Sequence, residues 1–183
     1  MSGKINVTAI GVAHLRTMRD FGRDRISWID CTVFFLCPAF VSFVIFVSGC
    51  SLNSGLVSSL VNASAILLGL LLNLLVLMFD QRNKAVDGLA CLENAENPDF
   101  NGKKRRLEVR CLVIDETVAN ISFTVLLCIF SLCTLLLFSM RAEGVGVDLI
   151  ERIVYSINSF IWINVSLTIL MVIKRVFALF SQV

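Results

Sequence analysis

The sequence predicts an all-α, polytopic membrane protein with four transmembrane helices, the second and third extended into a cytoplasmic hairpin. Three observations lead to this prediction. Of 183 residues, 57% are hydrophobic, whereas about 45–50% is usual for soluble domains. The apolar residues collect in four blocks without Asp, Glu, Lys or Arg, which are Cys31–Ser48, Leu56–Phe79, Val118–Phe138 and Ile153–Ile173. The basic residues are distributed unevenly between these blocks.

Each block is long enough to cross a bilayer, because about 30 Å of hydrocarbon requires about 20 helical residues. The first block barely reaches this length. Four such helices buried in a soluble core would leave too little polar surface to cover them. The sequence therefore divides into an arm (1–27), helices 1 and 2 (28–79), a hairpin (80–117), helices 3 and 4 (118–175) and a tail (176–183).

The basic residues predict the orientation, since Lys and Arg near membrane ends are retained in the cytoplasm. Fourteen of the 16 Lys and Arg residues flank the blocks on one side, and only Arg141 and Arg152 lie on the other. Both termini and residues 80–117 are therefore expected in the cytoplasm.

The amino-terminal arm is expected to be amphipathic. Ile10, Leu15, Met18 and Phe21 fall roughly on one side of a helix, and Arg16, Arg19 and Arg23 fall elsewhere. Such a helix either lies in the lipid headgroup layer or packs on another part of the cytoplasmic domain. In the first span, Pro38 is expected to cause a kink, which a neighbouring helix or Ser42 offsets.

The hairpin is predicted from helix-forming sequence on both sides of a turn. Gln81–Ala95 lacks Pro, Lys103–Thr117 is rich in helix formers, and the turn residues between them surround Pro98. The two spans then continue into the cytoplasm as helices of about 40 residues. Their apolar seam is expected to consist of Leu89, Leu92, Leu107, Cys111 and Ile114.

Polar and small residues recur on single faces of the spans. The second span carries Ser58, Asn62, Ala65, Gly69 and Asn73 at steps of three or four, the third carries Asn120, Thr124, Cys128 and Ser131, and the fourth carries Asn158, Asn164, Ser166 and Thr168. Such residues serve helix packing, at about 0.6 kcal/mol for each hydrogen bond on average, or line a polar path. The sequence leaves both interpretations open for Ser58, Asn62, Gly69, Asn73, Asn120, Thr124 and Asn158.

Acidic residues gather at the cytoplasmic ends of the spans, namely Asp30, Asp80, Asp115 and Glu116. In an oligomer they would form a ring that attracts cations. Pairing with the neighbouring Arg82, Arg110, Lys174 and Arg175 is the favoured interpretation.

The strongest charge feature is a basic patch, Lys103, Lys104, Arg105 and Arg106, with Arg110 one turn further along. It lies too far from the membrane to act only as a topology signal. It is expected to bind a protein partner, with a plain solvated helix face as the alternative. Direct nucleic-acid binding is not expected, because no groove-reading motif accompanies the patch.

No enzymatic pattern is present in the sequence. The chain has seven cysteines without zinc-ligand spacing and one histidine, His14, in the arm. A catalytic site, a metal and a cofactor are therefore not expected.

The overall layout resembles the KwaA family, the four-span membrane subunits of the Kiwa anti-phage defence system. The chain length, the uncharged turn Gly49–Gly55, the segment Asn73–Gln81 and the predicted hairpin carry this resemblance. It implies a homo-oligomer, a tetramer, in the bacterial inner membrane that senses phage attack and works with a cytoplasmic DNA-binding effector.

These features predict a sensor or scaffold that docks a soluble effector through its hairpin. The alternative is a pore that depolarises the membrane through its amide-bearing faces. A third interpretation is an accessory subunit of a larger membrane complex without an activity of its own.

Overall fold

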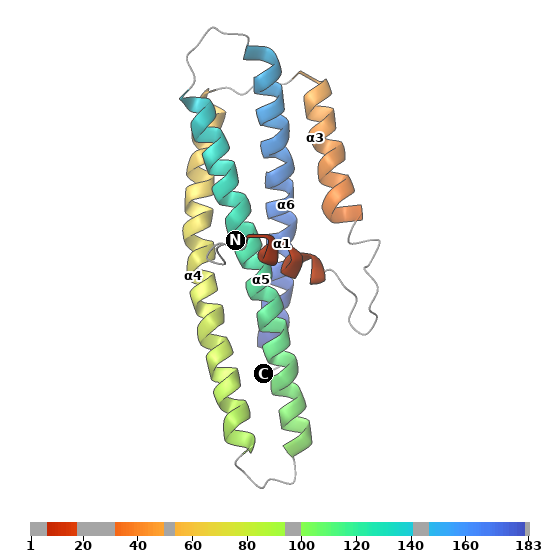
Figure 1. Cartoon of the computed structure of the whole chain (residues 1–183), viewed down its shortest axis with the longest axis vertical. Helices are drawn as coiled ribbons and strands as arrows, with labels where there is room; N and C mark the ends of the chain where they lie inside the picture. The colour runs from red at the N-terminus through yellow and green to blue at the C-terminus, as the bar shows by residue number, and fades with distance from the viewer. Residues whose placement is uncertain (1–6, 18–31, 50–53, 94–99, 141–146, 182–183) are drawn as a thin grey trace.

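The computed structural model describes residues 7–17, 32–49, 54–93, 100–140 and 147–181, and these are helical almost throughout, without a strand. The elements are α1 (Val7–Arg16), a π-helical turn η1 (Thr32–Leu36), α3 (Cys37–Val47), α4 (Ser54–Glu93), α5 (Phe100–Ser139) and α6 (Val147–Ser181). Figure 1 shows α4, α5 and α6 as long rods, with α3 beside α6 and α1 lying across the bundle.

Three described helices are long and apolar enough to cross a membrane, namely Ser54–Leu92, Gly102–Ser139 and Leu149–Phe177. The predicted helical fold is confirmed. Three helices of this length and hydropathy indicate a membrane protein. The apolar helix Thr32–Val47 is shorter. Its 16 residues extend about 24 Å at 1.5 Å per residue, less than the hydrocarbon thickness. The fourth span and the cytoplasmic position of the hairpin stay predictions.

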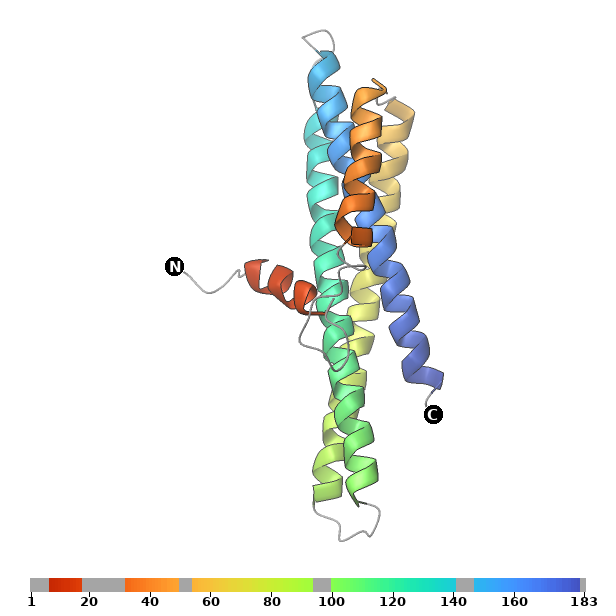
Figure 2. The ribbon, with the colours of Figure 1, turned by 90° about the vertical axis from the view of Figure 1, so that its right-hand side faces the viewer.

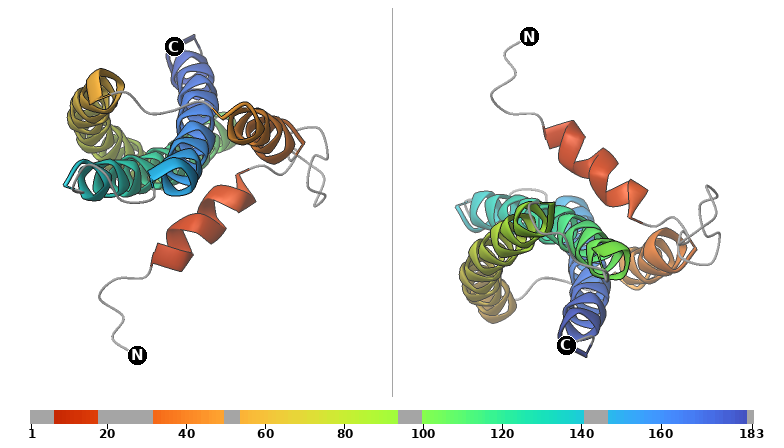
Figure 3. Two further views of the ribbon diagram at one scale, coloured as in Figure 1. Left: turned by 90° about the horizontal axis from the view of Figure 1, so that it is seen from above. Right: turned by 90° about the horizontal axis from the view of Figure 1, so that it is seen from below.

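Helix α5 is the element on which most of the others pack. It contacts α4, α6 and α1, whereas α3 and η1 contact α6. Among the described residues, α4 contacts α5 alone. The end-on views show this arrangement, with α4 and α6 against different sides of α5 (Figure 3).

Buried positions repeat every seven residues along the long helices. In α4 the buried positions are Val57, Ser64, Leu71, Met78 and Ala85. In α5 the repeat runs through Ile114, Thr117, Ile121, Thr124, Cys128, Ser131 and Leu135, and Asn120 is buried beside it. In α6 the same repeat of buried residues runs through Asn158, Ile161, Val165, Thr168 and Val172. A repeat of 3.5 residues keeps one seam facing a neighbouring helix over a long distance, as in coiled coils. This repeat explains how helices of 40 residues remain paired along their length.

Polar side chains in these seams form hydrogen bonds between the helices. Ser131 donates to Asn158 Oδ1 at 2.7 Å, which joins α5 to α6. Asn158 Nδ2 donates to the Val154 carbonyl at 2.9 Å. Because lipid offers no alternative partner, each such bond satisfies groups that would otherwise be costly to bury.

The start of α3 shows how the chain accommodates Pro38. The π-helical turn η1 precedes α3, and Pro38 lies in the first turn of α3, where its missing N–H costs no hydrogen bond. Ser42 does not offset the proline. Its hydroxyl donates to the Ser156 carbonyl at 2.6 Å, and the Ser156 hydroxyl donates to the Ser42 carbonyl at 2.8 Å. This reciprocal pair ties α3 to α6.

The Asn158 bridge predicts a measurable contribution to stability. Asn158→Ala removes the acceptor for Ser131, and we expect it to lower the free energy of unfolding by roughly 0.6–1.7 kcal/mol. Ser166→Ala is the matched control, because within the described part of the chain Ser166 bonds only to the Trp162 carbonyl of its own helix, on an exposed face. Reversible unfolding in mixed micelles measures both. Equal stabilities of the two variants would contradict the assigned role of Asn158.

Candidate functional site

The candidate site is the junction where α1 meets α5 and where Thr17, the residue after α1, meets α6. Figure 2 shows α1 nearly perpendicular to the long helices, close to the level at which α3 begins. The arm was expected in the lipid headgroup layer or on another part of the cytoplasmic domain. Its helix α1 packs on α5, where His14 contacts Asn120 and Phe123 inside the predicted span Val118–Phe138. The contacting side differs from the expectation, since His14 is buried and Leu15 is 48% exposed. Met18, Phe21, Arg19 and Arg23 lie outside the described residues.

Three polar side chains meet at the junction. His14 Nδ1 lies 2.8 Å from Asn120 Oδ1, and since an amide oxygen only accepts, the imidazole donates through Nδ1–H. The Thr17 hydroxyl lies 2.8 Å from the same oxygen and 2.7 Å from the His14 carbonyl. All three side chains are buried. Asn120 Nδ2 has no hydrogen-bond partner among the described residues.

Aromatic rings enclose His14. Its imidazole stacks on Phe123 with ring centroids 4.1 Å apart, and it meets Phe34 edge-on, with ring centroids 6.4 Å apart and the ring planes at 69°. Burial lowers the pKa of His14 below its ordinary value, and the charge of Arg175 lowers this pKa further, while the hydrogen bond to Asn120 acts in the opposite direction. The structure therefore favours a neutral imidazole.

Arg175 adds α6 to the junction. Its Nη2 donates to the Thr17 carbonyl at 3.0 Å, and its Nη1 lies 3.1 Å from Glu116 Oε2 of α5. The guanidinium thus caps the last carbonyl described in the arm and pairs with an acid on the next helix. Since this ion pair is mostly buried, removal of one partner would leave the other uncompensated.

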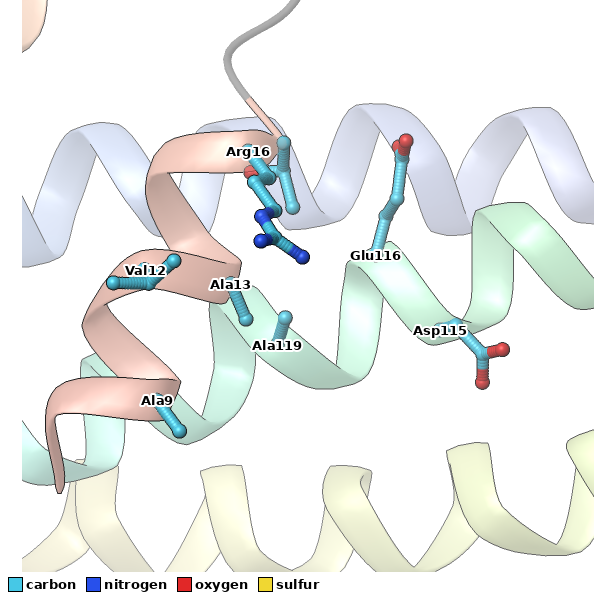
Figure 4. A pocket seen from close by; sticks show the side chains of 8 residues that line it. Ala9, Val12, Ala13, Arg16, Asp115, Glu116 and Ala119 are labelled. Atoms are coloured by element: carbon cyan, nitrogen blue, oxygen red, sulfur yellow. The ribbon is translucent and has the colours of Figure 1, made fainter. Parts of the chain in front are cut away.

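A cavity of about 390 Å³ lies between α1 and α5 beside this junction. Its lining consists of Ala9, Val12, Ala13, Arg16, Thr17, Asp115, Glu116 and Ala119. Figure 4 shows Arg16 extending into the space between the two helices. Asp115 faces the other way and pairs with Arg82 of α4 at 2.6 Å. Small alanines on both helices permit the close approach of α1.

The residues predicted for packing or pore lining divide into two groups. Asn120, Thr124 and Asn158 are buried inside the chain. Thr124 donates to the Asn120 carbonyl at 2.8 Å. The four on α4, namely Ser58, Asn62, Gly69 and Asn73, are exposed. The first group packs helices together within one chain, whereas the second does not.

The predicted partner-binding residues also divide. Lys103, Arg105 and Arg106 are exposed on the first turns of α5, and Lys104 is half-buried. Arg110 is half-buried and donates to Gln81 Oε1 of α4 at 3.1 Å. Arg110 therefore belongs to the contact between α4 and α5 rather than to an open basic surface.

The predicted pairing of acidic residues with Arg82, Arg110, Lys174 or Arg175 is confirmed for Asp115 and Glu116. Asp115 pairs with Arg82 and Glu116 with Arg175, whereas Asp80 pairs at 2.7 Å with Lys84, a residue of its own helix that was not among the expected partners. Asp30 lies outside the described residues. In the described part of the chain, no group of three or more His, Cys, Asp or Glu is placed to hold a metal ion.

The sequence analysis missed the role of His14 and Thr17. His14 was noted only as a lone histidine in the arm. The available signal was that His14 and Thr17 lie three residues apart, so that they share one face of a helix just before the first apolar block. The partner on α5 lies 106 positions away from His14, so no local pattern identifies it.

Protonation of His14 is predicted to weaken the docking of α1. Because the folded pKa lies below the ordinary 6.5, the contribution of the neutral imidazole to stability is present above pH 6.5. It is lost as the pH falls below 6.5 towards the folded value. His14 is the only histidine, so its NMR resonances report this titration without ambiguity.

We expect a titration midpoint below 6.5 in the folded chain, and a return to about 6.5 when Asn120→Leu releases α1. If Asn120→Leu removed the hydrogen bond but left α1 docked, the titration midpoint of His14 would fall further instead, because this bond raises the pKa of His14. A wild-type midpoint at or above 6.5 would show that the imidazole is not held as described.

Comparison of the chain with protein-family models, curated proteins and solved structures gives no match. The resemblance to the KwaA family accordingly stays a prediction.

Proposed function

We propose that this chain is an oligomeric membrane sensor or scaffold that docks an acidic surface of a cytoplasmic effector on the amino-terminal turns of α5. The observation that carries this proposal is the open basic surface at that end of the helix. Lys103, Arg105 and Arg106 are all exposed there, and they lie beyond the uncharged stretch that begins at Val118.

The shape of this surface supports binding of a protein group. A hollow of about 270 Å³ is lined by Gly102, Arg105, Arg106 and Val109. Two guanidinium groups beside an apolar side chain suit a carboxylate-bearing segment, because Arg binds carboxylates through paired hydrogen bonds. Lysine and arginine also increase the rate of encounter with an acidic partner.

Helix α5 connects this surface to the junction at α1. The helix is continuous from Phe100 to Ser139, and Asn120 is on the same rod as Arg105. A displacement of α1 that frees Asn120 would alter how α5 packs between α4 and α6. In the proposed mechanism, a disturbance of the membrane shifts the population between docked and released α1, and the effector responds.

The biological setting in this proposal is the one that the resemblance implies. The chain would work as a homotetramer in the inner membrane of a bacterium, with both termini inside, in defence against phage. Its effector would be the DNA-binding partner, and the chain itself would contact no nucleic acid.

The alternative function, a depolarising pore, is favoured by one observation. The α4 residues Asn62 and Asn73 are exposed on a strongly apolar helix, as conduit-lining amides would be before assembly. The buried Asn120, Thr124 and Asn158 argue against a conduit through the single chain, because they are enclosed in helix contacts.

Charge reversal tests the docking surface. We expect the triple variant Lys103→Glu, Arg105→Glu and Arg106→Glu to reduce co-purification of the effector from native membranes at least tenfold, because three attractive charges become repulsive. Quantitative mass spectrometry of the purified full chain measures this. Lys174→Glu is the matched control, since Lys174 is also exposed but lies on α6. Unchanged co-purification in the triple variant would remove the docking role.

A further inference from the structure

One polar face of α4 is exposed and packs against no other described helix. At about 100° per residue, Ser58, Asn62, Ala65, Gly69 and Asn73 form one face, here called the α4 amide face. Its centre lies about 150° around the helix from the buried positions Ser64 and Leu71, which face α5. All five residues of the face are exposed.

This face is unusual because of its surroundings. The most apolar window of α4 has a mean hydropathy of 2.4, and only 11% of it is buried, against 28% and 33% in α5 and α6. Neither Asn62 nor Asn73 has a side-chain hydrogen bond to any described residue. Polar residues of α5 and α6 such as Asn158 are instead enclosed and bonded. An amide facing hydrocarbon without a partner is costly.

Gly69 makes the same face suitable for close approach. A Cβ placed at Gly69 would have no atom within 4 Å, so the glycine serves no contact within the chain. Ala65 lies one turn before it. Two small residues four positions apart allow two helix backbones to approach closely in a membrane. The small side chains and the amides therefore occupy one continuous face.

We propose that the α4 amide face binds the same face of a second copy of this chain. Copies inserted with the same topology place their α4 helices parallel, so a two-fold axis along the membrane normal brings each residue opposite itself. The closest approach falls at Gly69. Asn62 and Asn73 lie about 10 Å and 6 Å along the axis on either side of it, and each meets its own copy.

Hydrogen bonding favours a second copy of this chain as the partner of the α4 amide face. A carboxamide has one acceptor oxygen and two donor hydrogens, so two facing Asn side chains exchange reciprocal bonds. Lipid tails offer neither donors nor acceptors. The interface satisfies both amides and does not use the basic surface on α5, so it is independent of effector docking.

Energy transfer between labelled copies of the full chain tests this pairing. Donor- and acceptor-labelled chains are reconstituted together in phospholipid vesicles at increasing lipid-to-protein ratio. We expect association in the wild type, and an apparent dissociation constant at least tenfold higher for Gly69→Leu and for the double variant Asn62→Leu and Asn73→Leu. The open space at Gly69 means that the single chain accommodates the leucine, which circular dichroism verifies.

Ala63→Leu is the matched control. It places the same leucine side chain at an exposed position of α4, about 120° away from the amide face, and is expected to associate like the wild type. Wild-type association in both Gly69→Leu and the double variant would overturn the proposal, as would a monomeric wild type at every ratio. An ion leak from the same vesicles that the double variant abolishes would also overturn it and assign the face to a conduit.

Discussion

The structure depends on how polar side chains are satisfied where water is absent. In hydrocarbon, an unpaired donor or acceptor costs several kcal/mol. In this chain, α5 carries many of the polar side chains that form hydrogen bonds within the bundle. Its buried seam alternates apolar residues with hydroxyls. Ser131 bonds across to α6, and Asn120 accepts from α1. The apolar residues place the helices in lipid, and the polar ones determine which helices become neighbours.

Asn120 is the residue that connects the arm to the spans. It lies two residues inside the block Val118–Phe138, and its side chain is fully buried. The His14 imidazole bonds to it while stacked on Phe123, and Arg175 brings α6 to the same point. The arm thus contacts α5 through α1 and α6 through Thr17, with few bonds, so its docking responds to small changes in either long helix. In the proposed function this responsiveness is what allows the arm to register the state of the membrane.

Much of the helical fold was predictable because its main cause is compositional. Blocks without charge, such as Leu56–Phe79, indicate spans by length alone, and the helices α4 and α5 continue past them as expected. The ion pairs of Asp115 and Glu116 were also predictable from neighbouring charges.

The sequence does not show which helix packs against a given helix face. Asn73 and Asn120 are both amides on periodic stripes, yet one faces away from the bundle and the other anchors α1. That difference depends on which helix lies beside each stripe, which follows from contacts far apart in the sequence. For the same reason Arg110 was placed in a partner-binding patch, although it bonds to Gln81 on α4.

Through its side-chain oxygen, Asn120 holds α1 against α5 at the end of the spans. Spin labels introduced through unnatural amino acids at Leu15 and Leu112, both exposed, test this claim by pulsed dipolar spectroscopy in lipid nanodiscs. We expect one narrow distance distribution in the native chain and a broad, longer one after Asn120→Leu. The same narrow distribution in both chains would contradict it.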